Sequence, residues 1–125
     1  MMWERVLLVA LAGAAGSVLR YSVAGFVGER LGPAVFGTFV VNVSGALLLG
    51  LLLGLTAERW LALALVRTAI VVGFLGAYTT FSTLAFETVD LAESGSLAAA
   101  LLNVGGSLAI GLAAMYTGLT VGRAL

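Results

Sequence analysis

Residues 34–57 read AVFGTFVVNVSGALLLGLLLGLTA, and no position in this stretch carries a charged side chain. A helix rises about 1.5 Å per residue, so about 20 apolar residues cross the ~30 Å hydrocarbon core of a bilayer. The 24 uncharged residues of this stretch are therefore long enough to span a membrane on their own. They predict a transmembrane helix at about 35–56.

Three further uncharged runs extend this prediction over the whole chain. Residues 68–86 and 94–122 carry no charge, and residues 6–19 form a shorter run that stays apolar beyond Arg20. We expect an all-α membrane protein with a single domain over residues 1–125 and four transmembrane helices at about 4–27, 35–56, 61–87 and 96–121. The solid apolar runs argue against a β-barrel, whose strands alternate polar and apolar residues. The apolar character past Arg20 argues against a cleaved signal peptide.

The composition excludes several classes of protein. Of the 125 residues, 62% are apolar and 10% are charged, whereas soluble domains have roughly 25% charged residues. Six basic and six acidic residues give no net charge, so nucleic acid is not an expected partner. The absence of His and Cys removes the commonest general base and metal ligands, and no nucleotide-binding motif is present. We expect a multi-pass protein of the cell inner (plasma) membrane that is not an enzyme.

Glycines four residues apart predict close contacts between helices. Such pairs let two backbones approach where lipid supplies no hydrophobic driving force. Three pairs occur: Gly50 with Gly54, Gly28 with Gly32, and Gly118 with Gly122. Gly122 lies beyond the expected fourth helix, so its pair is predicted to be weaker. Because glycine is common in membrane helices, these pairs could also lack a packing role.

The third expected helix has the densest polar signal, GFLGAYTTFST at residues 73–83. Four of its last five residues are hydroxylic. A helix can break at membrane depth where its backbone is buried in protein or lines a cavity, and Ser and Thr can bond the freed groups. Freed carbonyls can coordinate a cation, and a new helix start attracts anions. We predict a broken third helix, with a polar packing face as the alternative.

Each of the other three helices also has a polar residue, which is costly in lipid without a partner or a function. Arg20 could extend to the membrane interface or line a water-filled vestibule. Asn42 could hold two helices together or donate to a passing anion. Ser107 shares one helix face with Asn103 and Gly111, four residues before and after it, either as a helix contact or as a polar stripe.

The acidic residues lie at the ends of the predicted helices. Glu87 ends the third, and Asp90 and Glu93 are expected in the loop that follows. A proton-coupled carrier normally keeps an acid at membrane depth, so the sequence favours a passive conduit. Amide, hydroxyl, Arg and aromatic ring-edge groups favour an anion as the transported ion. The alternatives are a small four-helix proton-coupled multidrug antiporter and a membrane scaffold without transport.

Three motifs on three predicted helices resemble the fluoride channel family known as Fluc or CrcB. GAYTTFST at residues 76–83 is similar to the family signature G-x-x-T-T-F-S-T-F. GAAGSVLRY at residues 13–21 resembles its first-helix motif G-x-x-G-A-x-x-R-Y, and GTFVVN at residues 37–42 resembles G-T-L-x-V-N. The order and the spacing of the motifs fit over essentially the whole chain.

The resemblance implies an antiparallel homodimer of four-helix subunits with dual topology, which exports fluoride passively through two pores. The implied pore residues are Asn42, Phe81, Ser82, Thr83 and Ser107, with Arg20 at a vestibule. The resemblance also implies a structural sodium ion at the dimer centre, held by the backbone carbonyls of Gly76 and Thr79. Leu84 departs from the signature, which ends in Phe, so one of two expected aromatic edges is missing.

Overall fold

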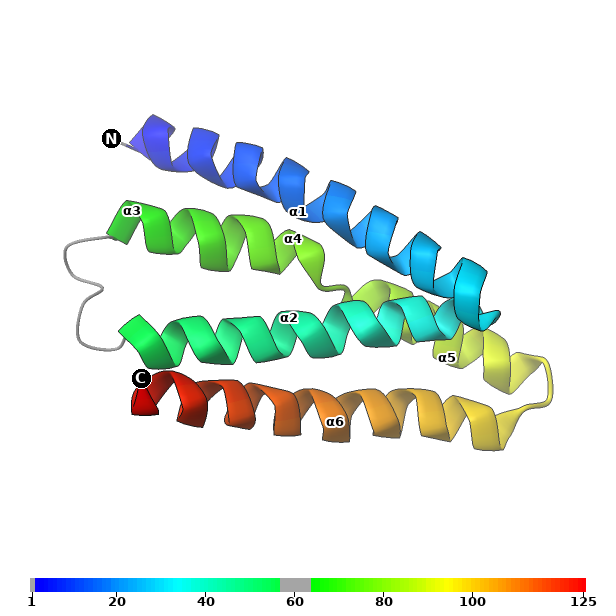
Figure 1. Cartoon of the computed structure of the whole chain (residues 1–125). Coiled ribbons are helices and arrows are strands. Elements are labelled where there is room, and N and C mark those ends of the chain that lie inside the picture. Colours follow the sequence, from blue (N-terminus) through cyan, green and yellow to red (C-terminus); the bar gives the residue numbers. More distant parts are fainter. Residues whose placement is uncertain (1, 57–63) are drawn as a thin grey trace.

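The computed structural model describes residues 2–56 and 64–125 (Figure 1). Three helices are continuous: α1 (Met2–Leu31), α2 (Ala34–Thr56) and α6 (Leu97–Ala124). Between α2 and α6 lie α3 (Ala64–Arg67), the π-helical η2 (Thr68–Leu75), α4 (Gly76–Tyr78) and α5 (Phe81–Glu93). Four spans are long and apolar enough to cross a membrane, the third being Ala64–Glu93. The prediction of a helical chain with four such spans is confirmed.

α1 and α5 continue further than predicted, because their charged residues do not stop the helix, whereas a glycine follows each of them. α5 runs to Glu93, so all three acidic residues expected at its end or in the next loop lie inside it. α1 runs to Leu31. Gly95 and Gly32 follow with φ of 87° and 93°, a left-handed conformation that glycine adopts without a steric penalty. Residues 61–63, the predicted start of the third helix, lie outside the described residues.

α2 holds the bundle together. It packs most extensively on α6 and also contacts α1 and α5, while α1 packs on η2 and α4. Val41 of α2 is fully buried. Many large apolar side chains point outward, as expected for helices in contact with lipid. Both chain termini lie at one end of the bundle, and the connection between α5 and α6 lies at the other (Figure 1).

Glycines bring the backbones of α2 and α6 together. A Cβ atom at Gly50 would lie 2.2 Å from the carbonyl oxygen of Met115. A Cβ atom at Gly118 would lie 2.3 Å from the carbonyl oxygen of Leu47. Side chains do not tolerate contacts this short, so the two helices can be this close only where glycine lies at the contact.

The two predicted glycine pairs on these helices both have this role. A Cβ atom at Gly54 would lie 2.5 Å from the carbonyl oxygen of Leu119, which confirms the prediction for the Gly50 and Gly54 pair. The prediction that Gly122 lies beyond the fourth helix is wrong, since α6 continues to Ala124 and Gly122 packs on α2. Within the described residues, a Cβ atom at Gly28 would meet nothing within 4 Å.

Candidate functional site

The third span is interrupted between α4 and α5. Thr79 (φ −83°, ψ 158°) and Thr80 (φ −148°, ψ 117°) have extended backbone, and α5 starts at Phe81. The Thr80 hydroxyl caps the new helix by accepting a hydrogen bond from the Thr83 amide at 3.3 Å, which is a common role of Thr before a helix. The Thr79 amide still donates to the Leu75 carbonyl at 3.1 Å, but the Thr80 amide does not donate to the Gly76 carbonyl as it would in a continuous helix.

Asn42 of α2 forms hydrogen bonds with the backbone of Thr80. Its Nδ2 donates to the Thr80 carbonyl at 2.9 Å, and its Oδ1 accepts from the Thr80 amide at 2.7 Å. Nearby, the hydroxyls of Ser44 and Tyr78 are 2.9 Å apart. Unpaired backbone groups in lipid cost several kcal/mol each, so these contacts let the interruption exist inside an apolar bundle.

A cavity of about 350 Å³, here called the Phe81 cavity, lies beside the interruption. Its lining brings together three of the predicted pore residues, Asn42, Phe81 and Ser107. Ser107 is buried, and its hydroxyl has no hydrogen-bond partner among the described residues. The Phe81 ring is 76% exposed in the single chain, whereas Leu84, which also lines the cavity, is 5% exposed.

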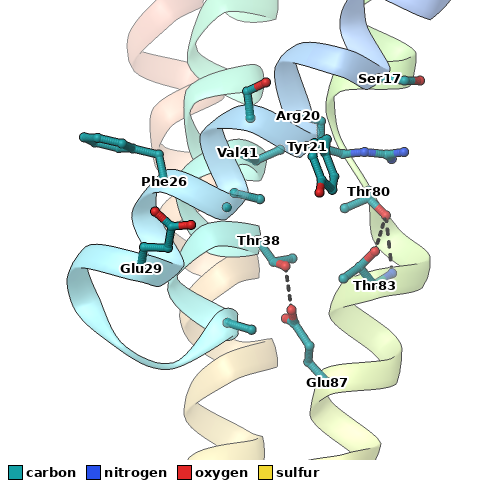
Figure 2. Close-up of a pocket in the computed structure, with 14 residues that line it drawn as sticks. Ser17, Arg20, Tyr21, Phe26, Glu29, Thr38, Val41, Thr80, Thr83 and Glu87 are labelled. Atoms are coloured by element: carbon teal, nitrogen blue, oxygen red, sulfur yellow. Dashed lines mark hydrogen bonds between the residues drawn. The ribbon is translucent and has the colours of Figure 1, made fainter.

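A second cavity of about 660 Å³, here called the Arg20 cavity, is bordered by α1, α2 and α5 (Figure 2). Thr83 and Arg20 both line it, and Thr80 lines both cavities. The Arg20 guanidinium donates to the Thr79 carbonyl at the long distance of 3.5 Å. Ser82 lines neither cavity; it is exposed, and its hydroxyl lies 3.4 Å from that of Thr80.

The Arg20 cavity also contains a pair that the sequence analysis missed. Thr38 donates from its hydroxyl to a carboxylate oxygen of Glu87 at 2.6 Å (Figure 2). The other Glu87 oxygen is buried without a partner among the described residues. Helical spacing could have revealed both residues, because Thr38 is four residues before Asn42 and Glu87 is four residues after Thr83.

The position of Glu87 changes one sequence-based argument. Glu87 was expected at the end of the third helix, but it lies inside α5. The expectation that the acidic residues lie at the ends of the helices is therefore wrong for Glu87. A carboxylate inside the third apolar span is compatible with a passive channel and with a proton-coupled carrier, so Glu87 does not favour either one.

The polar stripe predicted on α6 divides into three different environments. Asn103 donates from Nδ2 to the Thr88 hydroxyl at 3.1 Å, so it joins α6 to α5. Ser107 faces the Phe81 cavity. A Cβ atom at Gly111 would meet nothing within 4 Å among the described residues. Of the three, Ser107 is therefore the one that lines the Phe81 cavity, and its buried hydroxyl has no hydrogen-bond partner among the described residues.

Gly76 and Thr79 offer backbone oxygens beside the interruption, and both line the Phe81 cavity. In a continuous helix the Gly76 carbonyl would accept from the Thr80 amide, but that amide donates to Asn42. Within residues 2–56 and 64–125, the Thr79 carbonyl has only the long contact from Arg20. Carbonyl oxygens are suitable ligands for a hard cation. Across the described residues there is no group of three or more Asp or Glu side chains that could hold a metal.

Comparison with known proteins gives a consistent answer. Residues 7–119 match the family described as CrcB-like protein, Camphor Resistance (CrcB). A protein of Nitratidesulfovibrio vulgaris is 43% identical over 122 residues, which cover 96% of this chain and 98% of that protein. A protein of Nitrobacter winogradskyi is 41% identical over 126 residues, which cover both chains completely. Both relatives are named fluoride-specific ion channel FluC.

These matches cover nearly all of the chain at an identity well above the level of chance. Nothing in them supports the multidrug antiporter alternative. With four helices that can cross a membrane, the chain is a multi-pass membrane protein, consistent with the cell inner membrane. It belongs to the CrcB-like protein family.

Proposed function

We propose that this chain forms a fluoride-selective channel that lowers cytoplasmic fluoride by passive export. The observation that carries the proposal is the Phe81 cavity, which is lined by an aromatic ring and by buried Ser107, whose hydroxyl has no hydrogen-bond partner in the described part of the chain. Relatives over the full chain are named fluoride-specific ion channels. A ring edge has a partial positive charge and a hydroxyl donates a hydrogen bond, so both can stabilise an anion, and permeation needs sites that also release it.

The Arg20 cavity is proposed as the vestibule of this path. The Arg20 guanidinium would attract anions locally, while the carboxylates of Glu29 and Glu87, which line the same cavity, would act against their entry. The hydroxyls of Thr80 and Thr83, 3.0 Å apart, would continue the polar path toward the Phe81 cavity. Ser82 would contribute from the exposed side of α5. No residue in this path is proposed to be catalytic, and no nucleotide is required.

The working unit is proposed to be an antiparallel homodimer with two pores. The Phe81 ring is 76% exposed in one chain, so the Phe81 cavity needs a further wall before it can exclude lipid and water. A second copy related by a two-fold axis would close it with the same surface. The resemblance of the three motifs to fluoride channels adds the antiparallel orientation.

A sodium ion at the centre of that dimer is proposed as a structural cofactor. The Gly76 carbonyl does not accept from the Thr80 amide, which donates to Asn42, and the Thr79 carbonyl has a long contact from Arg20. One chain therefore offers two carbonyl oxygens to a cation. Two oxygens are too few for a hard cation, which prefers about six oxygen ligands. Two copies would supply four of them, so the donor set fits a shared ion. Bound there, the ion would offset the repulsion of facing carbonyl dipoles.

The channel proposal is tested by efflux from liposomes that contain the purified protein. Fluoride should leave the liposomes at a rate far above that of protein-free controls, and chloride should leave at the control rate. The reason is that a narrow path lined by a few fixed donors discriminates between anions by their size and hydration. Comparable fluoride and chloride efflux would replace the proposal with a general anion pore, and control-level fluoride efflux would refute transport.

Dual topology is tested with a Ser94→Cys variant. The chain has no native cysteine, and Ser94 is exposed in the connection after α5. Arginines near both termini, such as Arg5 and Arg123, outnumber Arg30 at the other end, which favours a single orientation. An antiparallel dimer instead predicts that an impermeant thiol reagent labels about half of the molecules in intact cells. Labelling near zero or near all molecules would rule out the antiparallel arrangement.

A further inference from the structure

We propose that Asn42 is a positioning residue that holds the interruption of the third span, rather than a group that donates directly to the transported ion. This inference rests on the proposed channel function. Asn42 lines the Phe81 cavity, but its amide is engaged at both ends by one backbone unit, the amide and the carbonyl of Thr80. Asn42 therefore bonds both backbone groups of Thr80, as a residue of a neighbouring strand would in a β-sheet.

The pairing requires an amide side chain. Thr80 has extended backbone, so its N–H needs a partner from outside the third span. Its carbonyl is that of the N-cap residue, which accepts the first bond of α5 and has a second lone pair free for Asn42. Asn presents a donor and an acceptor side by side on one planar group. At 2.7 and 2.9 Å, both bonds have good lengths. An Asp could accept from Thr80 but could not donate to it, and a Ser is too short to form both bonds.

The neighbouring surface of α2 is shaped to receive the interruption. A Cβ atom at Gly45 would lie 2.3 Å from the Thr79 methyl group and 3.2 Å from the Tyr78 ring. Gly45 is therefore small enough for the extended segment to lie against α2 within reach of Asn42. The contact of Ser44 with the Tyr78 hydroxyl fixes the end of α4 on the same helix.

The pairing has consequences for the rest of the site. Because the Thr80 amide donates to Asn42, the Gly76 carbonyl is released from the bond of a continuous helix. Because the Thr80 carbonyl is held as well, α5 starts at a fixed place, which sets the positions of Phe81 and Thr83. Asn42 would thus control both the proposed pore ring and the proposed sodium ligand without contacting either ion.

Hydrogen exchange of the Thr80 amide, measured by NMR in detergent micelles, reports the pairing without any reference to fluoride. Asn42→Ala and Asn42→Ser should raise that exchange rate by roughly fivefold or more, which corresponds to about 1 kcal/mol for a lost hydrogen bond. Asn42→Asp keeps the acceptor and should retain most of the protection. Asn103→Ala, which removes an amide that joins α5 to α6, is the matched control and should leave Thr80 unchanged. Unchanged exchange within α6 verifies that each Asn42 variant is folded.

Fluoride efflux from liposomes then separates the two roles of Asn42. The positioning role predicts that Asn42→Ser loses efflux together with protection of Thr80, although its hydroxyl could still donate to an anion. Lost efflux with normal protection of Thr80 would mean that Asn42 acts on the ion directly, which would overturn the inference. So would raised exchange with normal efflux. If the unmodified protein carries no fluoride, the channel proposal fails, while the exchange data still decide whether Asn42 holds Thr80.

Discussion

Phe81→Ile is expected to reduce fluoride efflux to the level of protein-free liposomes while the protein still folds and assembles. Isoleucine has a similar apolar character but no ring, so it lacks the positive edge that would face a partly dehydrated anion. The effect should be close to complete, because Leu84 replaces the other aromatic residue of the signature and is buried in the subunit. Efflux is measured with a fluoride electrode, and assembly by size exclusion in detergent.

Phe86→Ile is the matched control for this prediction. Phe86 lies on the same helix and is 71% exposed, close to the value for Phe81, but it lines neither of the two cavities. Its replacement should leave efflux near that of the unmodified protein. If Phe81→Ile assembles normally and still conducts at a near-normal rate, Phe81 does not belong to the ion path.

The helices could be predicted from the sequence because their signal is local. About 20 apolar residues without a charge are sufficient evidence for a membrane span, as residues 34–57 illustrate. The ends of α1 and α5 are harder to predict, because a charged residue limits an apolar run but does not end a helix. In α5 the backbone continues through its acidic residues until Gly95, whose left-handed conformation ends it.

The candidate site could be predicted only in part, because the residue types were visible and their partners were not. The hydroxylic run at residues 79–83 indicates a site in the third span, and in the structure Phe81 and Ser107 line one cavity beside it. The bonds between Asn42 and Thr80, and between Thr38 and Glu87, join residues 38 and 49 positions apart. No local pattern contains such a pairing. The side-chain periodicity of α2 and α5 indicates only which face each residue occupies.

Gly118→Ala is expected to lower the free energy of unfolding by about 1–3 kcal/mol, the usual cost of forcing an extra methyl group into a packed interface. The new Cβ atom would lie 2.3 Å from the Leu47 carbonyl and 2.8 Å from the Leu51 amide. Both neighbours are backbone atoms of α2, which cannot rotate away as a side chain could. α2 and α6, the most extensively packed pair in the bundle, would have to separate along this contact.

Gly28→Ala separates this packing effect from the general effect of adding alanine to a helix. A Cβ atom there has nothing within 4 Å among the described residues. Since alanine favours helix over glycine by about 1 kcal/mol, this variant should be as stable as the unmodified protein or slightly more stable. Unfolding in mixed detergent micelles, followed by circular dichroism, compares the two variants directly. Equal stability of both would mean that the α2 and α6 backbones are not held at the distance that Gly118 permits. A selective loss in Gly118→Ala would identify this close contact as a main source of the stability that keeps α2, and with it Asn42, in place against the interrupted span.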